Sequence, residues 1–182
     1  MHKTITKLIA SVGVLGLVGS LVAYSVALAL DTATVGATVT VQNIAVSVDD
    51  ADHDHAVAYG TLGNDSTMST CGDEKDDAQT ITNTGNVNED FVIKAIANAS
   101  TPDWTIGDAA AEDVYVHKFQ NGACALVSGF SGTTLDTTGK PFASGITPEG
   151  TATLNLQINT PNPSTSYDQQ TVDVTITATQ SP

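Results

Sequence analysis

The sequence contains no arginine, and its six basic residues are all lysine, whereas 20 residues are aspartate or glutamate. The formal charge is −14 with histidine counted as neutral. Proteins bind nucleic-acid phosphates and anionic membrane surfaces through clustered cationic side chains. The sequence therefore excludes a nucleic-acid partner, and it excludes a membrane partner that is held by a basic patch.

Aromatic residues make up only 5% of the chain, and Trp104 is its one tryptophan. Carboxylates are numerous enough to supply a glycosidase pair, but a sugar-binding platform of several exposed aromatic rings is missing. The motifs H-E-x-x-H and G-x-S-x-G and a glycine-rich phosphate loop are also missing. We therefore predict that the chain is not an enzyme and has no catalytic residues. Trp104 and His117 are expected to be packing residues.

The first 29 residues have the pattern of an export signal. Lys3 and Lys7 precede an uncharged run from Leu8 to Leu30, and Ala27-Leu28-Ala29 supplies the small-x-small pattern of a cleavage site. The alternative is that this apolar leader helix is retained as a membrane anchor, because the run is long enough to span a bilayer. Either way the rest of the chain is expected outside the cell or at its surface. A cleaved chain carries 4 lysines against 20 carboxylates, a charge of −16.

The chain has only two cysteines, Cys71 and Cys124. An exported protein meets an oxidising environment, and two cysteines allow a single intramolecular pairing. There is no C-x-x-C motif that would indicate a redox pair. We therefore predict a structural disulfide between Cys71 and Cys124.

The remaining sequence has strand periodicity almost throughout, and 41% of the whole chain is apolar. Turn-forming clusters separate the runs, and only Asp108–Glu112 is expected to form a helical turn. This pattern predicts an all-β fold, a single antiparallel β-sandwich of jelly-roll or immunoglobulin-like type. The predicted domains are a leader at 1–29, an N-terminal strand at 30–48 and a sandwich at 49–182. The runs with strand periodicity are Val35–Val41, Ile44–Val48, Ala56–Leu62, Ala78–Thr82, Asp90–Ala97, Asp113–Phe119, Ala123–Val127, Thr151–Thr160 and Thr171–Thr179.

Four aspartates gather just after the N-terminal apolar run, at Asp49, Asp50, Asp52 and Asp54. Calcium prefers carboxylate and carbonyl oxygens from a flexible loop, so these residues are candidate calcium ligands. The EF-hand pattern is incomplete, because its sixth position is His55 and its twelfth is Thr61. Zinc bound by His53, His55 and an aspartate is a second option. The third option is a solvated acidic turn without metal.

The N-terminal apolar run has two interpretations. Donor-strand exchange requires an apolar, alternating strand near the mature N-terminus that completes the sheet of a neighbouring subunit. Such head-to-tail contacts are open and generate filaments. The same residues could instead form the first strand of their own sandwich. The candidate assembly residues are Val35, Ala37, Val39, Val41, Ile44, Val46 and Val48.

Two further pieces, Tyr59-Gly60-Thr61-Leu62 and Ile81-Thr82-Asn83-Thr84-Gly85-Asn86-Val87, follow the leader and the apolar run in the chain. In this order of features the sequence resembles the exported fibre proteins of the TasA and camelysin group. The resemblance implies a jelly-roll fold and extracellular fibres assembled by strand donation. The chain differs from that group in its disulfide candidate and its scarcity of lysine.

Together these features predict a non-enzymatic structural protein, a subunit of an extracellular filament or surface layer. Its partners would be further copies of the same chain or other surface proteins. The alternative is a calcium-dependent or adhesive binding module on the cell surface, in which the loops around Asp49–Asp54 engage the ligand.

Overall fold

The computed structural model describes residues 36–50, 53–54, 56–71, 77–97, 103–123 and 130–182. Several predictions fall on residues outside these ranges: the leader, Val35, Asp52, His55, Cys124, and residues 124–127 of the run Ala123–Val127. The chain divides into two units, Met1–Thr40 and Val41–Pro182. Only residues 36–40 of the first unit are described, and they have no regular secondary structure.

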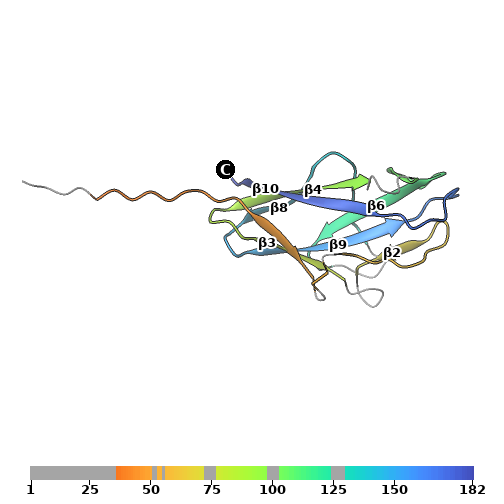
Figure 1. The fold of residues 1–182 in the computed structure, drawn as a ribbon, viewed down its shortest axis with the longest axis horizontal. Coiled ribbons are helices and arrows are strands. Elements are labelled where there is room, and N and C mark those ends of the chain that lie inside the picture. The colour runs from red at the N-terminus through yellow and green to blue at the C-terminus, as the bar shows by residue number, and fades with distance from the viewer. Residues whose placement is uncertain (1–35, 51–52, 55, 72–76, 98–102, 124–129) are drawn as a thin grey trace, which may run out of the picture. The chain divides into compact units, whose positions relative to one another are not determined.

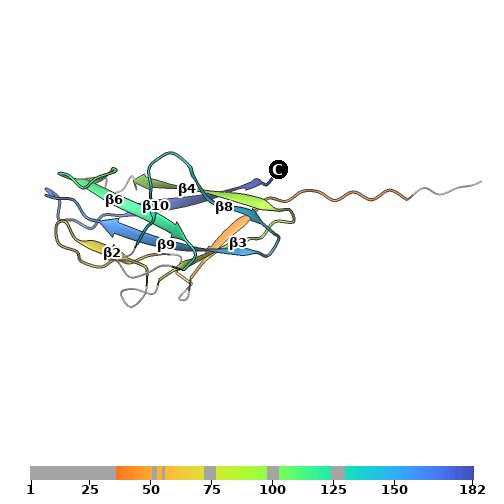
Figure 2. The same ribbon diagram turned by 180° about the vertical axis from the view of Figure 1, so that it is seen from behind.

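The described residues contain strands and no helix, which confirms the predicted all-β class. No helix in this part of the chain is long and apolar enough to cross a membrane. Seven strands form the larger sheet, in the order β1-β3-β9-β6-β5, with β2 paired to β9 and β7 paired to β6. Figures 1 and 2 show β2, β3, β6 and β9 of this sheet. All its pairings are antiparallel except that of β5 with β6. Its strands are β1 (Val46–Asp49), β2 (Thr67–Ser69), β3 (Gln79–Asn83), β5 (Thr105–Ile106), β6 (Val114–Asn121), β7 (Thr133–Thr134) and β9 (Thr151–Asn159).

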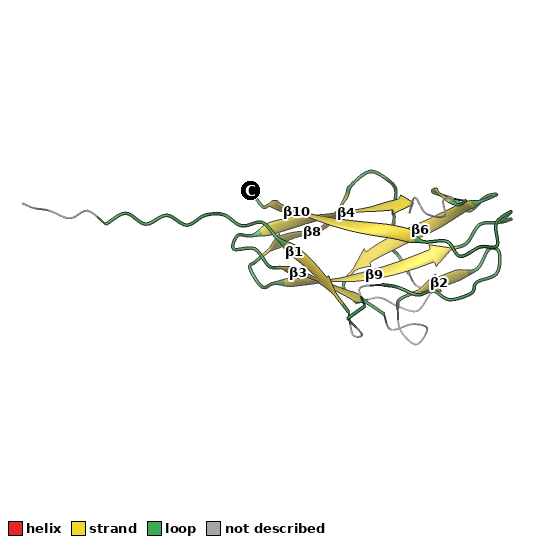
Figure 3. Ribbon diagram, in the orientation of Figure 1, coloured by secondary structure: helices red, strands yellow, loops and turns green. Residues whose placement is uncertain are grey.

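The smaller sheet has three antiparallel strands in the order β10-β4-β8 (Figure 3). Its strands are β4 (Glu89–Ala97), β8 (Lys140–Ile146) and β10 (Val172–Gln180). All nine residues of β10 pair with β4 in an unbroken register. The pairing of β4 with β8 shifts register twice.

Both sheets contribute to one hydrophobic core. Ile81, Leu154 and Leu156 come from the larger sheet, and Phe91 and Ile93 come from the smaller one; all five are buried. The alternation predicted for β9 and β10 places their apolar side chains against this core. In β9 the opposite face is buried as well, at Asn155 and Gln157. Two sheets that share one core are consistent with a β-sandwich.

Three local predictions are wrong. Ala56–Leu62 forms no strand, because Val57 and Tyr59 pack on the core from a segment that turns at Gly60, whose φ is +75°. Asp108–Glu112 forms no helical turn; Ala111 and Val114 instead exchange hydrogen bonds across a tight turn at Asp113.

The third wrong prediction concerns the N-terminal run. Residues 36–45 form no strand, and only Val46–Asp49 joins the sheet, as the edge strand β1. The sequence pattern also does not predict β8, because Gly139 and Pro141 are residues typical of turns. Proline is tolerated at the edge of a sheet, where its missing N–H is not needed for pairing.

Candidate functional site

The N-terminal segment, residues 36–45, is the most exposed apolar stretch of the described chain. Val39 is 89% exposed and Val41 is 79% exposed. The segment contains no charged residue. Of the other predicted assembly residues, Ala37 and Ile44 are exposed, whereas Val46 and Val48 are half-buried in β1. The structure thus divides the predicted strand into an exposed part and a part that belongs to the sheet.

The turn between β3 and β4 holds the second half of this segment. Asn86 uses its side chain and backbone: Nδ2 donates to the Val41 carbonyl (2.8 Å), Oδ1 accepts from Asn43 N (2.8 Å), and its N–H donates to the Asn43 carbonyl (3.0 Å). Thr84 N donates to the Ala45 carbonyl (2.9 Å). Ala45 N in turn donates to Glu89 Oε1 (2.9 Å). We call Thr84, Gly85, Asn86 and Glu89 the clamp.

The clamp is itself fixed by Asn83, which is fully buried. Its Nδ2 donates to the carbonyls of Val87 and Ile146, both at 2.8 Å, and its Oδ1 accepts from Gly85 N at 2.8 Å. These bonds explain why asparagine and glycine occupy these positions of the Asn83–Asn86 turn. Sequence reasoning noted the pattern but missed its role, which depends on partners about 40 residues earlier in the chain.

Gly85 allows the segment to approach the turn closely. A Cβ at Gly85 would lie 2.4 Å from the Asn43 carbonyl oxygen and 2.4 Å from Glu89 Oε1. Gly85→Ala should lower the free energy of unfolding by about 2 kcal/mol, because backbone must move to make room. Urea denaturation measures this. At Gly36 a Cβ would have no atom within 4 Å, so Gly36→Ala is the matched control and should change stability by less than about 0.5 kcal/mol. Equal stability of the two variants would contradict this account of the clamp.

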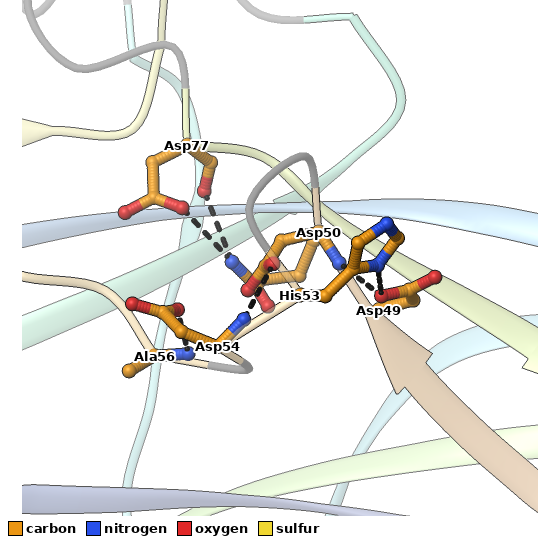
Figure 4. A network of polar contacts seen from close by, with 7 residues as sticks. Asp49, Asp50, His53, Asp54, Ala56 and Asp77 are labelled. Atoms are coloured by element: carbon orange, nitrogen blue, oxygen red, sulfur yellow. Dashed lines mark hydrogen bonds and ion pairs between the residues drawn. The ribbon is translucent and has the colours of Figure 1, made fainter.

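The acidic loop after β1 uses its carboxylates on its own backbone (Figure 4). Asp49 Oδ1 accepts from Asp50 N (3.0 Å) and lies 2.6 Å from His53 Nδ1. Asp50 Oδ1 accepts from Asp54 N (3.2 Å), and Asp54 Oδ1 accepts from Ala56 N (2.9 Å). Such bonds are typical of aspartate-stabilised turns. No group of three or more His, Cys, Asp or Glu residues that could hold a metal occurs within the described ranges, from which Asp52 is missing. Calcium and zinc binding stay predictions.

His117 lies in a buried row of β6 together with Tyr115 and Phe119. It is 3% exposed, and its Nε2 lies 2.9 Å from the Tyr59 hydroxyl. Its buried Nδ1 has no hydrogen-bond partner among the described residues. Burial disfavours the charged imidazolium and lowers the pKa of His117 from 6.5 to about 4. Burial also raises the pKa of Tyr115 to about 12. At neutral pH this row is therefore an uncharged part of the core.

Acidification should destabilise the fold through His117. Because its pKa is lower in the folded than in the unfolded chain, the unfolded chain binds the extra proton as the pH falls from 6.5 towards 4. We expect the free energy of unfolding to fall by about 2 kcal/mol between pH 7 and pH 4.5, measured by urea denaturation. His117→Gln should remove most of this dependence, whereas His53→Gln, at an exposed histidine, should retain it. The same pH dependence in wild type and His117→Gln would disprove the assignment.

Trp104 has a packing role as well. Its Nε1 donates to Ser164 Oγ (2.9 Å), and its ring centroid lies 6.3 Å from that of Tyr115. Asp113, in the turn between β5 and β6, contacts the same loop as Trp104 does, because its Oδ1 accepts from Thr165 N (2.7 Å). Hydrogen bonds from Thr165 hold the pKa of Asp113 below its usual value. The half-buried Trp104 therefore fastens two loops together and does not form a ligand platform.

A small polar pocket of about 210 Å³ lies beside β6 and β9. Its lining includes Asp108, Lys118, Gln157 and Asn159. The rest of the lining is Thr67, Ala109, Ala110 and Val116. The polar side chains supply hydrogen-bonding groups to the pocket.

No protein-family model matches the chain, and no curated protein matches it. The resemblance to the TasA and camelysin group therefore stays a prediction. The exposed segment and the clamp that holds its base are the features from which a function can be argued.

Proposed function

We propose that this chain is a non-enzymatic, exported structural protein that assembles into an extracellular filament or surface layer by β-strand donation. Its fold in this proposal is a β-sandwich of jelly-roll or immunoglobulin-like type. The leader at residues 1–29 is either cleaved or retained as a membrane anchor. The donated strand is the exposed part of the N-terminal segment, Ala37–Val41. The acceptor is a second copy of the chain.

The observation that carries the proposal is the exposure of Val39 and Val41 in a segment with β-forming residues and no strand partner. Apolar side chains exposed at 89% and 79% are costly in water, and pairing with another sheet would bury them. The alternation of valine with Thr38 and Thr40 suits a strand with one apolar face. An exposed segment of this kind is a typical donor in β-strand addition.

The clamp supports the same proposal. It fixes residues 41–45 by hydrogen bonds to Asn86, Thr84 and Glu89. A donor strand must remain firmly attached to its own subunit if the filament is to bear load. The two parts meet at Val41, whose carbonyl is held by Asn86 while its side chain is exposed. The base of the segment is therefore held while its apolar side chains remain available.

Negative-stain electron microscopy of the purified chain from residue 30 onward tests the proposal. The mature charge of −16 opposes self-association, and salt screens this repulsion. We therefore expect filaments whose amount increases with sodium chloride or divalent cations. A strictly monomeric protein at high concentration under all these conditions would contradict the proposal and favour the alternative of a surface binding module.

A further inference from the structure

We propose that the donated segment binds along the free edge of β10 in the neighbouring subunit. The inference rests on the proposed function and specifies its acceptor. The strand added at this edge is residues 37–41 of a second copy of this chain. Four of the described strands, β1, β5, β8 and β10, lie at the ends of the two sheets.

Most edges among the described strands are short or irregular. β5 has two residues and β1 has four. β8 contains Pro141, has a φ of +66° at Gly145, and shifts register twice against β4. Short strands, prolines and bulges are the features by which natural proteins prevent pairing at an edge. These three edges are thus poor acceptors.

β10 has none of these protective features. It is nine residues long, contains no proline or glycine, and pairs with β4 without a register shift. Asp173, near its beginning, is its only charged residue. A long, regular and nearly uncharged edge presents unpaired backbone groups to another strand. In a mature chain with a charge of −16, an edge with a single charged residue also limits the repulsion between copies at the contact.

The side chains of β10 have the same alternation as the segment. Val172, Val174, Ile176 and Ala178 pack against the core, yet all four remain only half-buried. Threonines alternate with these residues, as Thr38 and Thr40 alternate with the alanine and valines of the segment. Directly opposed residues of neighbouring strands point to the same face of a sheet. Pairing can therefore continue the apolar row on one face and the threonine row on the other.

The lengths are also compatible. Five extended residues, Ala37–Val41, span about 17 Å, whereas the nine residues of β10 span about 30 Å. The segment therefore fits within the edge in more than one register. Added beside β10, it would cover the exposed parts of Val174 and Ile176 and bury its own Val39 and Val41 at the same time.

Cross-linking between two differently labelled chains tests the acceptor. One chain carries Thr40→Cys and the other Thr177→Cys, on the face where both side chains are exposed, and a short bis-maleimide links them after co-assembly. We expect the yield of this heterodimer to exceed by at least tenfold that of the control pair, Thr40→Cys with Ser144→Cys on β8. Equal or greater linkage to β8 overturns the inference, and so does the absence of any heterodimer linked between positions 40 and 177. If filaments form but the cross-linking gives either of these results, the proposed function stands and only the β10 acceptor is wrong. If no filaments form, both the proposed function and the β10 acceptor are contradicted.

A lysine at the same edge provides a second test. Thr177→Lys should reduce filament yield at least tenfold while the monomer keeps its melting temperature, because an edge lysine opposes strand addition. The matched control, Ser144→Lys, adds the same charge to β8 and should leave the yield unchanged. The added positive charge lowers the repulsion between acidic chains, so a loss of filaments cannot come from net charge. Undiminished filament formation by Thr177→Lys would overturn the assignment of β10.

Discussion

Deletion of residues 30–40 should leave a folded monomer that forms no filaments. The exposed Val39 and its neighbours are removed, whereas the clamp contacts to residues 41–45 are retained. The deletion removes no residue of the hydrophobic core. We therefore expect the melting temperature to stay within about 2 °C of the undeleted monomer, because surface changes away from the core have small effects.

The matched variants are two double substitutions at the same valines. Val39→Asp with Val41→Asp places charges on the apolar face and should abolish filaments as the deletion does, because burying unpaired carboxylates is costly. Val39→Ile with Val41→Ile keeps the apolar face and should preserve them. Electron microscopy and sedimentation measure the outcome. Filaments formed by the deletion variant at the wild-type yield would contradict strand donation by this segment.

Loss of the Cys71–Cys124 disulfide should have the largest effect on stability. Cys71 is 1% exposed, and the described part of the chain contains no free cysteine. Cys124 lies outside that part, so the pairing remains a prediction. A bridge between residues 71 and 124 would stabilise the fold by about 4 kcal/mol in the chain-entropy model. Cys71→Ala with Cys124→Ala should therefore lower the free energy of unfolding by about that amount.

Thiol titration provides the control for this prediction. The denatured, unreduced protein should contain no free thiol, and the same protein should contain two after reduction. Reduction of the wild type should lower its stability about as much as the double substitution does. Two free thiols before reduction would disprove the bridge.

Part of the fold follows from local patterns. The alternation in Thr151–Thr160 and Thr171–Thr179 identifies β9 and β10, because successive side chains of a strand point to opposite faces and the apolar residues therefore recur with a two-residue period. β8 breaks that pattern with Pro141 and Gly145, and only its position at a sheet edge makes it a strand. The alternation in Ala56–Leu62 has another origin, because Val57 and Tyr59 contact the core without strand pairing.

The candidate site depends more strongly on tertiary contacts. The apolar character of Val39 and Val41 is visible in the sequence, but their exposure is not. The clamp joins Asn43 and Ala45 to Asn86 and Glu89, residues separated by more than 40 positions. No local pattern encodes such a pairing. The free edge of β10 likewise follows only from the strand order.

Amide hydrogen exchange of residues 37–41 in assembled and unassembled protein tests the central claim most directly. In the monomer these residues form no strand, so their amides should exchange rapidly. In the filament, donation should slow alternate amides of this segment by at least about 100-fold, because a strand at a new sheet edge bonds every second N–H to its partner. Filaments in which these amides exchange as fast as in the monomer would contradict strand donation.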